Sequence, residues 1–65
     1  MLLDDPLFLV MLRKALHKSQ EEFGYIFGLS SHSISSWERG IRKPGGSARI
    51  LLKQIATDAK NQGIL

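Results

Sequence analysis

The sequence contains no cysteine, and this absence removes several classes of protein from consideration. Without cysteine there is no disulfide framework, no thiolate nucleophile and no zinc site built on sulfur. Long apolar runs are also missing, because the stretch from residue 7 to 12 is far shorter than the roughly 20 residues that a membrane helix needs. Two aspartates precede this stretch, where a secretory signal would carry positive charge. We therefore expect a soluble, cytoplasmic protein that has no contact with a membrane.

What the sequence does contain is enough for one small domain. A chain of 65 residues buries a smaller fraction of its surface than a larger domain, so its stability should be marginal unless a partner contributes. Apolar residues make up 43% of the chain, which is sufficient for a helical core. Nine basic and six acidic residues give a net charge of +3, which is compatible with a nucleic-acid partner but does not establish one. No repeat or linker is visible, so residues 1–65 are treated as a single domain.

The stretch from residue 19 to 40 predicts two short helices joined by a tight turn. Ser19 and Glu22 have the spacing of a capping box, which starts a helix, and Gly28 can end that helix in the left-handed conformation. Ser30 can then cap a second helix that ends at Gly40. Short helices joined by about three residues with a glycine in the turn are typical of the helix-turn-helix motif, whose second helix enters the DNA major groove.

The flanking segments predict one helix on each side of this motif. Asp5 and Pro6 favour a helix start after a loose lead-in, and Ser47 can cap a last helix. Gly24 lies inside a predicted helix, where glycine costs about 1 kcal/mol relative to alanine, so we expect another helix to cross closely there. The predicted fold is all-α, a small four-helix bundle with helices at about 6–17, 20–27, 31–39 and 47–61.

The order and spacing of several residues in this stretch resemble a known family, the Cro/Xre-type helix-turn-helix domains of phage repressors and bacterial regulators. The residues that carry the resemblance are Gln20, Phe23, Gly28, Ile34, Trp37, Glu38 and Gly40. The string Trp37-Glu38-Arg39-Gly40, followed by Pro44, Gly46, Ala48 and Leu51-Leu52, further resembles the antitoxin branch, the HigA and MqsA type DNA-binding domains. The resemblance covers residues 9–55. It implies a lambda-repressor-like bundle, double-stranded DNA as the partner, a homodimer, and a cognate toxin as a candidate second partner.

The resemblance assigns base contacts to the second helix of the motif. His32 and Ser36 match positions that reach base edges in the family, and Ser31 and Ser35 lie beside them. Because serine hydroxyls both donate and accept, they discriminate bases weakly, so DNA shape and bridging water should contribute to specificity. The alternative for His32 is a solvated side chain. A metal site is not expected, since the only other imidazole, that of His17, lies in the first helix.

Contacts with DNA phosphates are assigned to four further residues. Gln20 matches a phosphate-contacting position of the family, and its alternative is an ordinary solvated residue of the first turn. Arg39, Arg42 and Lys43 adjoin the recognition helix in a region from which the family contacts the sugar-phosphate backbone, although a charge pair on a loop is usually just solvated. If these three cations neutralise three phosphates per protomer, affinity should fall steeply with salt.

Two further groups of residues are assigned to structure and association. Arg13 and Glu38 match positions that form a partly buried ion pair in the family, and an exposed Glu38 would repel phosphate. On the first helix, Leu7 and Met11 lie nearly opposite the core-facing leucines, with Phe8 at the border. A small monomer rarely exposes such a cluster, so we expect a dimer or partner surface there. The alternative is that the C-terminal tail folds over it.

These features predict a sequence-specific transcriptional repressor or autorepressor of antitoxin type. It should bind a palindromic operator as a dimer, with half-sites about one helical turn apart. The alternative function is a protein-interaction module, such as a toxin-neutralising part, that uses the apolar surface of the first helix. A basic amphipathic protein of the membrane surface is a weaker alternative, because it would not need the capping box or the ion pair. We expect neither an enzyme nor a cofactor, because no carboxylate or nucleophile stands at a sensible spacing from His32.

Overall fold

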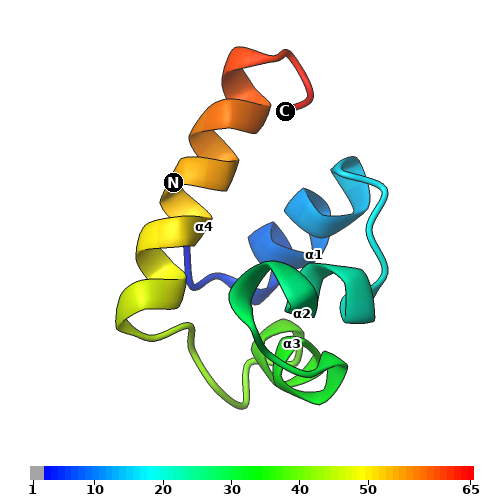
Figure 1. The fold of residues 1–65 in the computed structure, drawn as a ribbon, viewed down its shortest axis with the longest axis vertical. Coiled ribbons are helices and arrows are strands. Elements are labelled where there is room, and N and C mark those ends of the chain that lie inside the picture. The colour runs from blue at the N-terminus through cyan, green and yellow to red at the C-terminus, as the bar shows by residue number, and fades with distance from the viewer. Residues whose placement is uncertain (1–2) are drawn as a thin grey trace.

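The computed structural model describes residues 3–65, which form four helices and no strand (Figure 1). The helices are α1 (Pro6–Ala15), α2 (Gln20–Phe27), α3 (Ser31–Glu38) and α4 (Gly46–Asn61). In Figure 1 the three short helices lie together on one side of the longer α4, with α3 at the lower end of the molecule. The predicted all-α, four-helix fold is confirmed.

Side-chain caps set the starts of the first three helices. The Asp5 carboxylate caps α1, and the Ser30 hydroxyl accepts a backbone N–H of α3. At α2 the capping box is complete, because the Ser19 hydroxyl accepts the Glu22 N–H at 3.0 Å and the Glu22 carboxylate accepts the Ser19 N–H at 2.8 Å. These backbone and hydroxyl hydrogen bonds from Ser19 lower the pKa of Glu22 below its ordinary value. The helix-turn-helix segment thus begins at a fixed residue.

Three details at the ends of the elements differ from the predictions. α1 ends at Ala15 rather than at His17, because His17 has a left-handed backbone with a φ of 57°. The predicted Ser47 cap of α4 is wrong: Gly45 is the N-cap residue, and no side chain caps this helix. The lead-in is not loose at its described residues, since Leu3 is buried in the core. Residues 1–2 of the predicted lead-in lie outside the described part of the chain.

The core lies where α4 faces the three short helices. α4 contributes Leu52, Ala56 and Ala59, all of them buried. The rings of Phe23, Phe27 and Trp37 form two edge-to-face pairs with centroid separations of 5.1 and 5.3 Å. The remaining buried hydrophobic residues are Leu3, Leu9, Leu12 and Ile34. α3 contributes only its inner face to this core, so its outer face is open to solvent.

Gly24 is required by a close approach, but the neighbour is not the one predicted. A Cβ atom at this position would lie 2.5 Å from the backbone carbonyl oxygen of Leu29, in the turn between α2 and α3. The N–H of Leu29 donates to the Gly24 carbonyl at 2.9 Å, and Gly28 has the left-handed φ of 68° that ends α2. The turn therefore packs directly against α2 and fixes the position of α3 relative to it.

Candidate nucleic-acid interface

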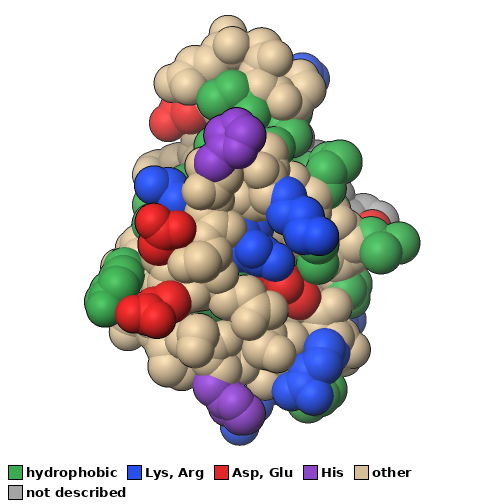
Figure 2. Space-filling model, turned by 90° about the vertical axis from the view of Figure 1, so that its right-hand side faces the viewer, with side chains coloured by type: hydrophobic (Ala, Val, Ile, Leu, Met, Phe, Trp, Pro, Cys, Tyr) green, Lys and Arg blue, Asp and Glu red, His purple; other side chains and the backbone are tan. Residues whose placement is uncertain are grey.

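The candidate interface is the outer face of α3. Ile34 and Trp37 are buried on the inner face, while Ser31 and His32 are exposed and Ser35 is half-buried on the outer one. Figure 2 shows histidine and basic side chains at the lowest end of the molecule, around α3, and the acidic side chains visible on this face lie above that end. Three of the four predicted base-contacting residues are therefore brought together on one polar surface.

Ser36 does not belong to this surface. Its side chain is buried, with 6% of the residue exposed, and its hydroxyl donates to the His32 carbonyl at 3.1 Å. The chain after α3 folds back onto this turn, because the N–H groups of Ile41 and Arg42 donate to the Ser36 carbonyl at 3.0 and 3.3 Å. The prediction that Ser36 lies on the exposed face is therefore wrong, because its side chain is buried and its hydroxyl is already bonded within α3.

Basic side chains border the outer face of α3. Arg39, Arg42 and Lys43 are all exposed, and among residues 3–65 neither arginine has a carboxylate within 4.0 Å. Between residues 31 and 49 there are four basic residues and one acidic residue, Glu38, whereas the rest of the chain carries five of each sign. The net charge of +3 is therefore contributed by this segment alone. Such a concentration of positive charge favours polyanions.

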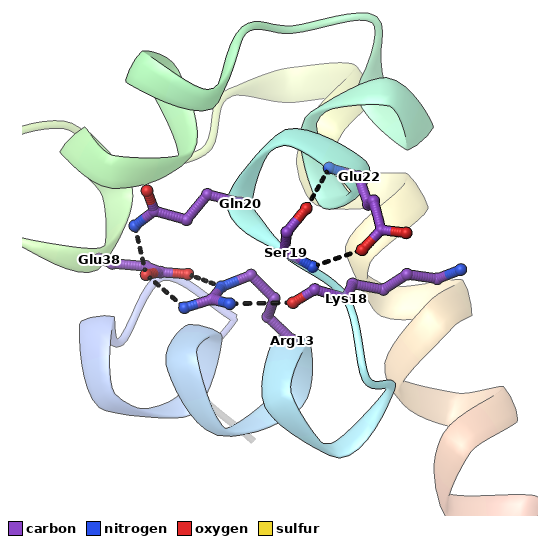
Figure 3. A network of polar contacts seen from close by, with 6 residues as sticks. All are labelled: Arg13, Lys18, Ser19, Gln20, Glu22 and Glu38. Carbon is purple, nitrogen blue, oxygen red and sulfur yellow. Dashed lines mark hydrogen bonds and ion pairs between the residues drawn. The ribbon is translucent and has the colours of Figure 1, made fainter.

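Glu38 is directed away from the outer surface and into a network with α1 and α2 (Figure 3). Its carboxylate accepts from the Arg13 Nε at 2.5 Å and Nη2 at 3.1 Å, and from the Gln20 Nε2 at 3.0 Å. Arg13 also donates to the Lys18 carbonyl at 2.9 Å. Only 13% of the Arg13 side chain and 8% of the Glu38 side chain are exposed. The expected Arg13–Glu38 ion pair is therefore present, and together with Gln20 it joins the three short helices.

The protonation of Glu38 is controlled by opposing effects. Burial acts to raise the pKa of Glu38, but the hydrogen bonds from Arg13 and Gln20, together with the charges of Arg13 and Lys14, outweigh it. The pKa is therefore lowered below its ordinary value of 4.5, and the carboxylate stays charged at neutral pH.

Gln20 is half-buried at the start of α2 and is bonded to another side chain. Its amide nitrogen donates to Glu38, so one of its two amide N–H bonds is already used. The second amide N–H remains for a ligand at the start of α2. Its predicted phosphate contact stays a prediction.

The apolar surface of α1 is smaller than predicted. Leu7 is 80% exposed and Met11 is 51% exposed, whereas Phe8 is half-buried and packs against the core. The C-terminal tail does not cover these residues, because the N–H groups of Ile64 and Leu65 bond back to a carbonyl of α4 and Leu7 remains open. Within residues 3–65, no helix combines the length and the apolar character that crossing a bilayer requires.

The position of Asp4, near the candidate interface, was not predicted from the sequence. The carboxylate of Asp4 lies 3.9 Å from the Lys43 Nζ and 3.6 Å from the Arg49 Nη1. No sequence pattern indicates this contact, because Asp4 precedes the helix-turn-helix in the chain whereas Lys43 and Arg49 follow it.

Lys43 also borders a groove of about 300 Å³ between α3 and the start of α4, with Arg42 and Trp37 among its other lining residues.

Comparison of the chain with models of protein families, with curated proteins and with solved structures finds no match. The geometry and charge of α2, the turn and α3 are therefore the features of the molecule that point to a function.

Proposed function

We propose that the chain is a sequence-specific DNA-binding transcriptional regulator of the Cro/Xre type. The observation that supports this most is the arrangement of α2 and α3, two eight-residue helices joined by the three-residue turn 28–30, with α3 at one end of the molecule. Such an arrangement is the one that helix-turn-helix proteins use to insert their second helix into the major groove. Its outer face is polar and bordered by cations, as an interface with DNA requires.

In this proposal, Ser31, His32 and Ser35 contact base edges. An α-helix with its side chains is about 10–12 Å in diameter, and the major groove of B-DNA is about 12 Å wide, so α3 can enter it. Hydroxyl groups accept or donate to several bases, so His32 supplies most of the direct discrimination and the remainder comes from DNA shape and bridging water.

The surrounding cations supply affinity rather than specificity. Arg39, Arg42 and Lys43 contact phosphates beside the groove, and the start of α2 with the free amide N–H of Gln20 contacts another. Three neutralised phosphates correspond to a slope of about −2.7 in a plot of log affinity against log salt concentration.

The regulator acts as a repressor or autorepressor of antitoxin type in this proposal. Two copies on a palindromic operator would place their α3 helices about 34–36 Å apart, one turn of B-DNA. The dimer and the antitoxin character are supported by the family resemblance of the sequence and by the exposed apolar residues of α1, which offer a surface for association.

The test is a titration of DNA binding against salt, using the duplex upstream of the protein's own gene and a scrambled duplex of the same composition. We expect tighter binding to the native duplex, and His32→Ala should reduce this preference. His17→Asn is the matched control, because it removes the other imidazole while asparagine tolerates the left-handed backbone at that position. Equal binding of both duplexes, unaffected by His32→Ala, would reject the proposal.

A second candidate function is a protein-interaction module, such as the toxin-neutralising part of an antitoxin. It is favoured by the exposure of Leu7 and Met11, which nothing in the described chain covers. Met11→Asp should then convert a dimer into a monomer in sedimentation equilibrium or abolish capture of a co-expressed toxin, whereas Gln54→Asp on the exposed side of α4 should do neither. If Met11→Asp changes neither association nor capture, this surface is not an interface.

A further inference from the structure

Among residues 3–65, Asp4 is the one acidic residue outside the segment 31–49 whose carboxylate lies within 4.0 Å of a cation in that segment. Leu3, with 8% of its surface exposed, anchors the start of the described chain in the core, and the segment then runs beside α4 before entering α1 (Figure 1). This path places the Asp4 carboxylate 3.9 Å from Lys43 and 3.6 Å from Arg49. Asp4 therefore faces two of the four cations between residues 31 and 49.

We propose that Asp4 is an internal counter-ion that competes with phosphate for Lys43 and thereby limits the affinity of this surface for polyanions. The identity of the polyanion as operator DNA rests on the proposed function, but the competition itself does not. The Lys43 and Arg49 side chains are 78% and 51% exposed, and neither ion pair is accompanied by a hydrogen bond within the described residues. Both cations can therefore exchange the carboxylate for a phosphate oxygen.

Arg42 provides a comparison within the same loop. It borders the same groove as Lys43, yet no carboxylate lies within 4.0 Å of it among residues 3–65. Binding of phosphate at Lys43 displaces a carboxylate as well as solution ions, whereas binding at Arg42 displaces solution ions alone. Lys43 should therefore contribute less than Arg42 to polyanion affinity and to its dependence on salt.

The first experiment compares Asp4→Asn with Asp58→Asn on immobilised heparin and on the native duplex. Both substitutions add one unit of positive net charge, but Asp58 lies in the second half of α4 and forms no ion pair in the described chain. We expect Asp4→Asn to elute from heparin at higher salt than Asp58→Asn, and to steepen the salt dependence of duplex binding by up to about 0.9 in slope. Equal elution of the two variants would overturn the proposal.

A second pair of variants keeps the proposal testable if Asp4→Asn folds poorly. Lys43→Gln and Arg42→Gln remove the same charge from adjacent positions of one loop. We expect Arg42→Gln to lower the eluting salt more than Lys43→Gln, and an equal or opposite order would overturn the proposal.

The two proposals fail separately. If Asp4→Asn elutes from heparin at higher salt than Asp58→Asn but the native duplex is not preferred over the scrambled one, the counter-ion role of Asp4 stands. The proposed function as a DNA-binding regulator is then rejected. If the native duplex is preferred and the two aspartate variants elute from heparin at the same salt, the proposed regulator function stands. The counter-ion role of Asp4 is then rejected.

Discussion

Replacing Glu38 by glutamine should destabilise the protein more than any other isosteric removal of charge from it. The substitution keeps the shape of the side chain but removes the negative charge that balances Arg13, whose side chain is only 13% exposed. The guanidinium then keeps its bond to the Lys18 carbonyl and gains a neutral amide oxygen in place of a carboxylate. A largely buried charge is left without a counter-ion, which is the costly outcome for such pairs.

The magnitude follows from the geometry of the network. Removing one partner of a fully buried ion pair costs about 3–5 kcal/mol. Here Arg13 reaches some solvent and glutamine still accepts one hydrogen bond, so we expect about 2–3 kcal/mol. Domains have unfolding free energies of about 0.05–0.15 kcal/mol per residue, or about 3–10 kcal/mol for 65 residues, so the loss is a large part of the total. At about 4–8 °C per kcal/mol, the melting temperature should fall by at least about 8 °C.

Urea denaturation followed by the fluorescence of Trp37 measures this loss directly. Trp37 is the only tryptophan, it is buried, and it contacts Phe27, so its emission reports on the core. Urea is preferable to guanidinium chloride because it does not screen charges. Glu21→Gln is the control, since it removes an exposed carboxylate from α2 and should cost less than about 1 kcal/mol.

The pH dependence of the stability difference between wild type and Glu38→Gln is the stricter test of this account. Because the pKa of Glu38 is lowered in the folded state, its stabilising contribution is complete above the ordinary pKa of 4.5 and is lost as the pH falls through the lower folded-state value. The stability difference between wild type and Glu38→Gln should therefore be constant at neutral pH and should shrink below pH 4.5. A difference under about 0.5 kcal/mol at pH 7, or one that does not shrink in acid, would refute this account of the network.

Two further substitutions test separate parts of the fold by the same denaturation assay, and a third tests the candidate interface by DNA affinity. Gly24→Ala should lower stability by about 1–3 kcal/mol despite the better helix propensity of alanine, because its Cβ would collide with the Leu29 carbonyl; an unchanged or raised stability would show that the turn moves easily. Ser19→Ala should cost about 1 kcal/mol through loss of the capping box, and a change below about 0.3 kcal/mol would contradict its role. Ser36→Ala should leave the affinity for DNA unchanged while His32→Ala reduces it, and loss of binding in Ser36→Ala without unfolding would contradict its burial.

The sequence predicted the short-range features of this fold well, because they depend on residues a few positions apart. The capping box of α2, its glycine end at Gly28 and the Ser30 cap of α3 are all present. The predicted Ser47 cap of α4 is not formed, because the N-cap residue is Gly45, two residues earlier, and no side chain caps this helix.

Features that depend on distant segments could not be predicted from helical periodicity. Ser36 has the spacing of an exposed residue, yet it is buried, and its hydroxyl donates to the His32 carbonyl. Leu3 and Asp4 carry no local signal, and their positions are determined by packing beside α4. The Arg13–Glu38 pair was expected only through resemblance to a family, since nothing local joins the two residues.

The network inside the bundle and the candidate interface depend on the same helix. Glu38 is the last residue of α3, and its bonds to Arg13 and Gln20 hold α3 in one rotation about its axis, with His32 directed outwards. The same inward direction removes from the surface the only negative charge of the segment 31–49. The charge beside α3 is then that of the cations that follow it, Arg39, Arg42 and Lys43, and Asp4 offsets it at one edge only. Burial of one carboxylate thus positions the outer face of α3 and also makes its surroundings positive.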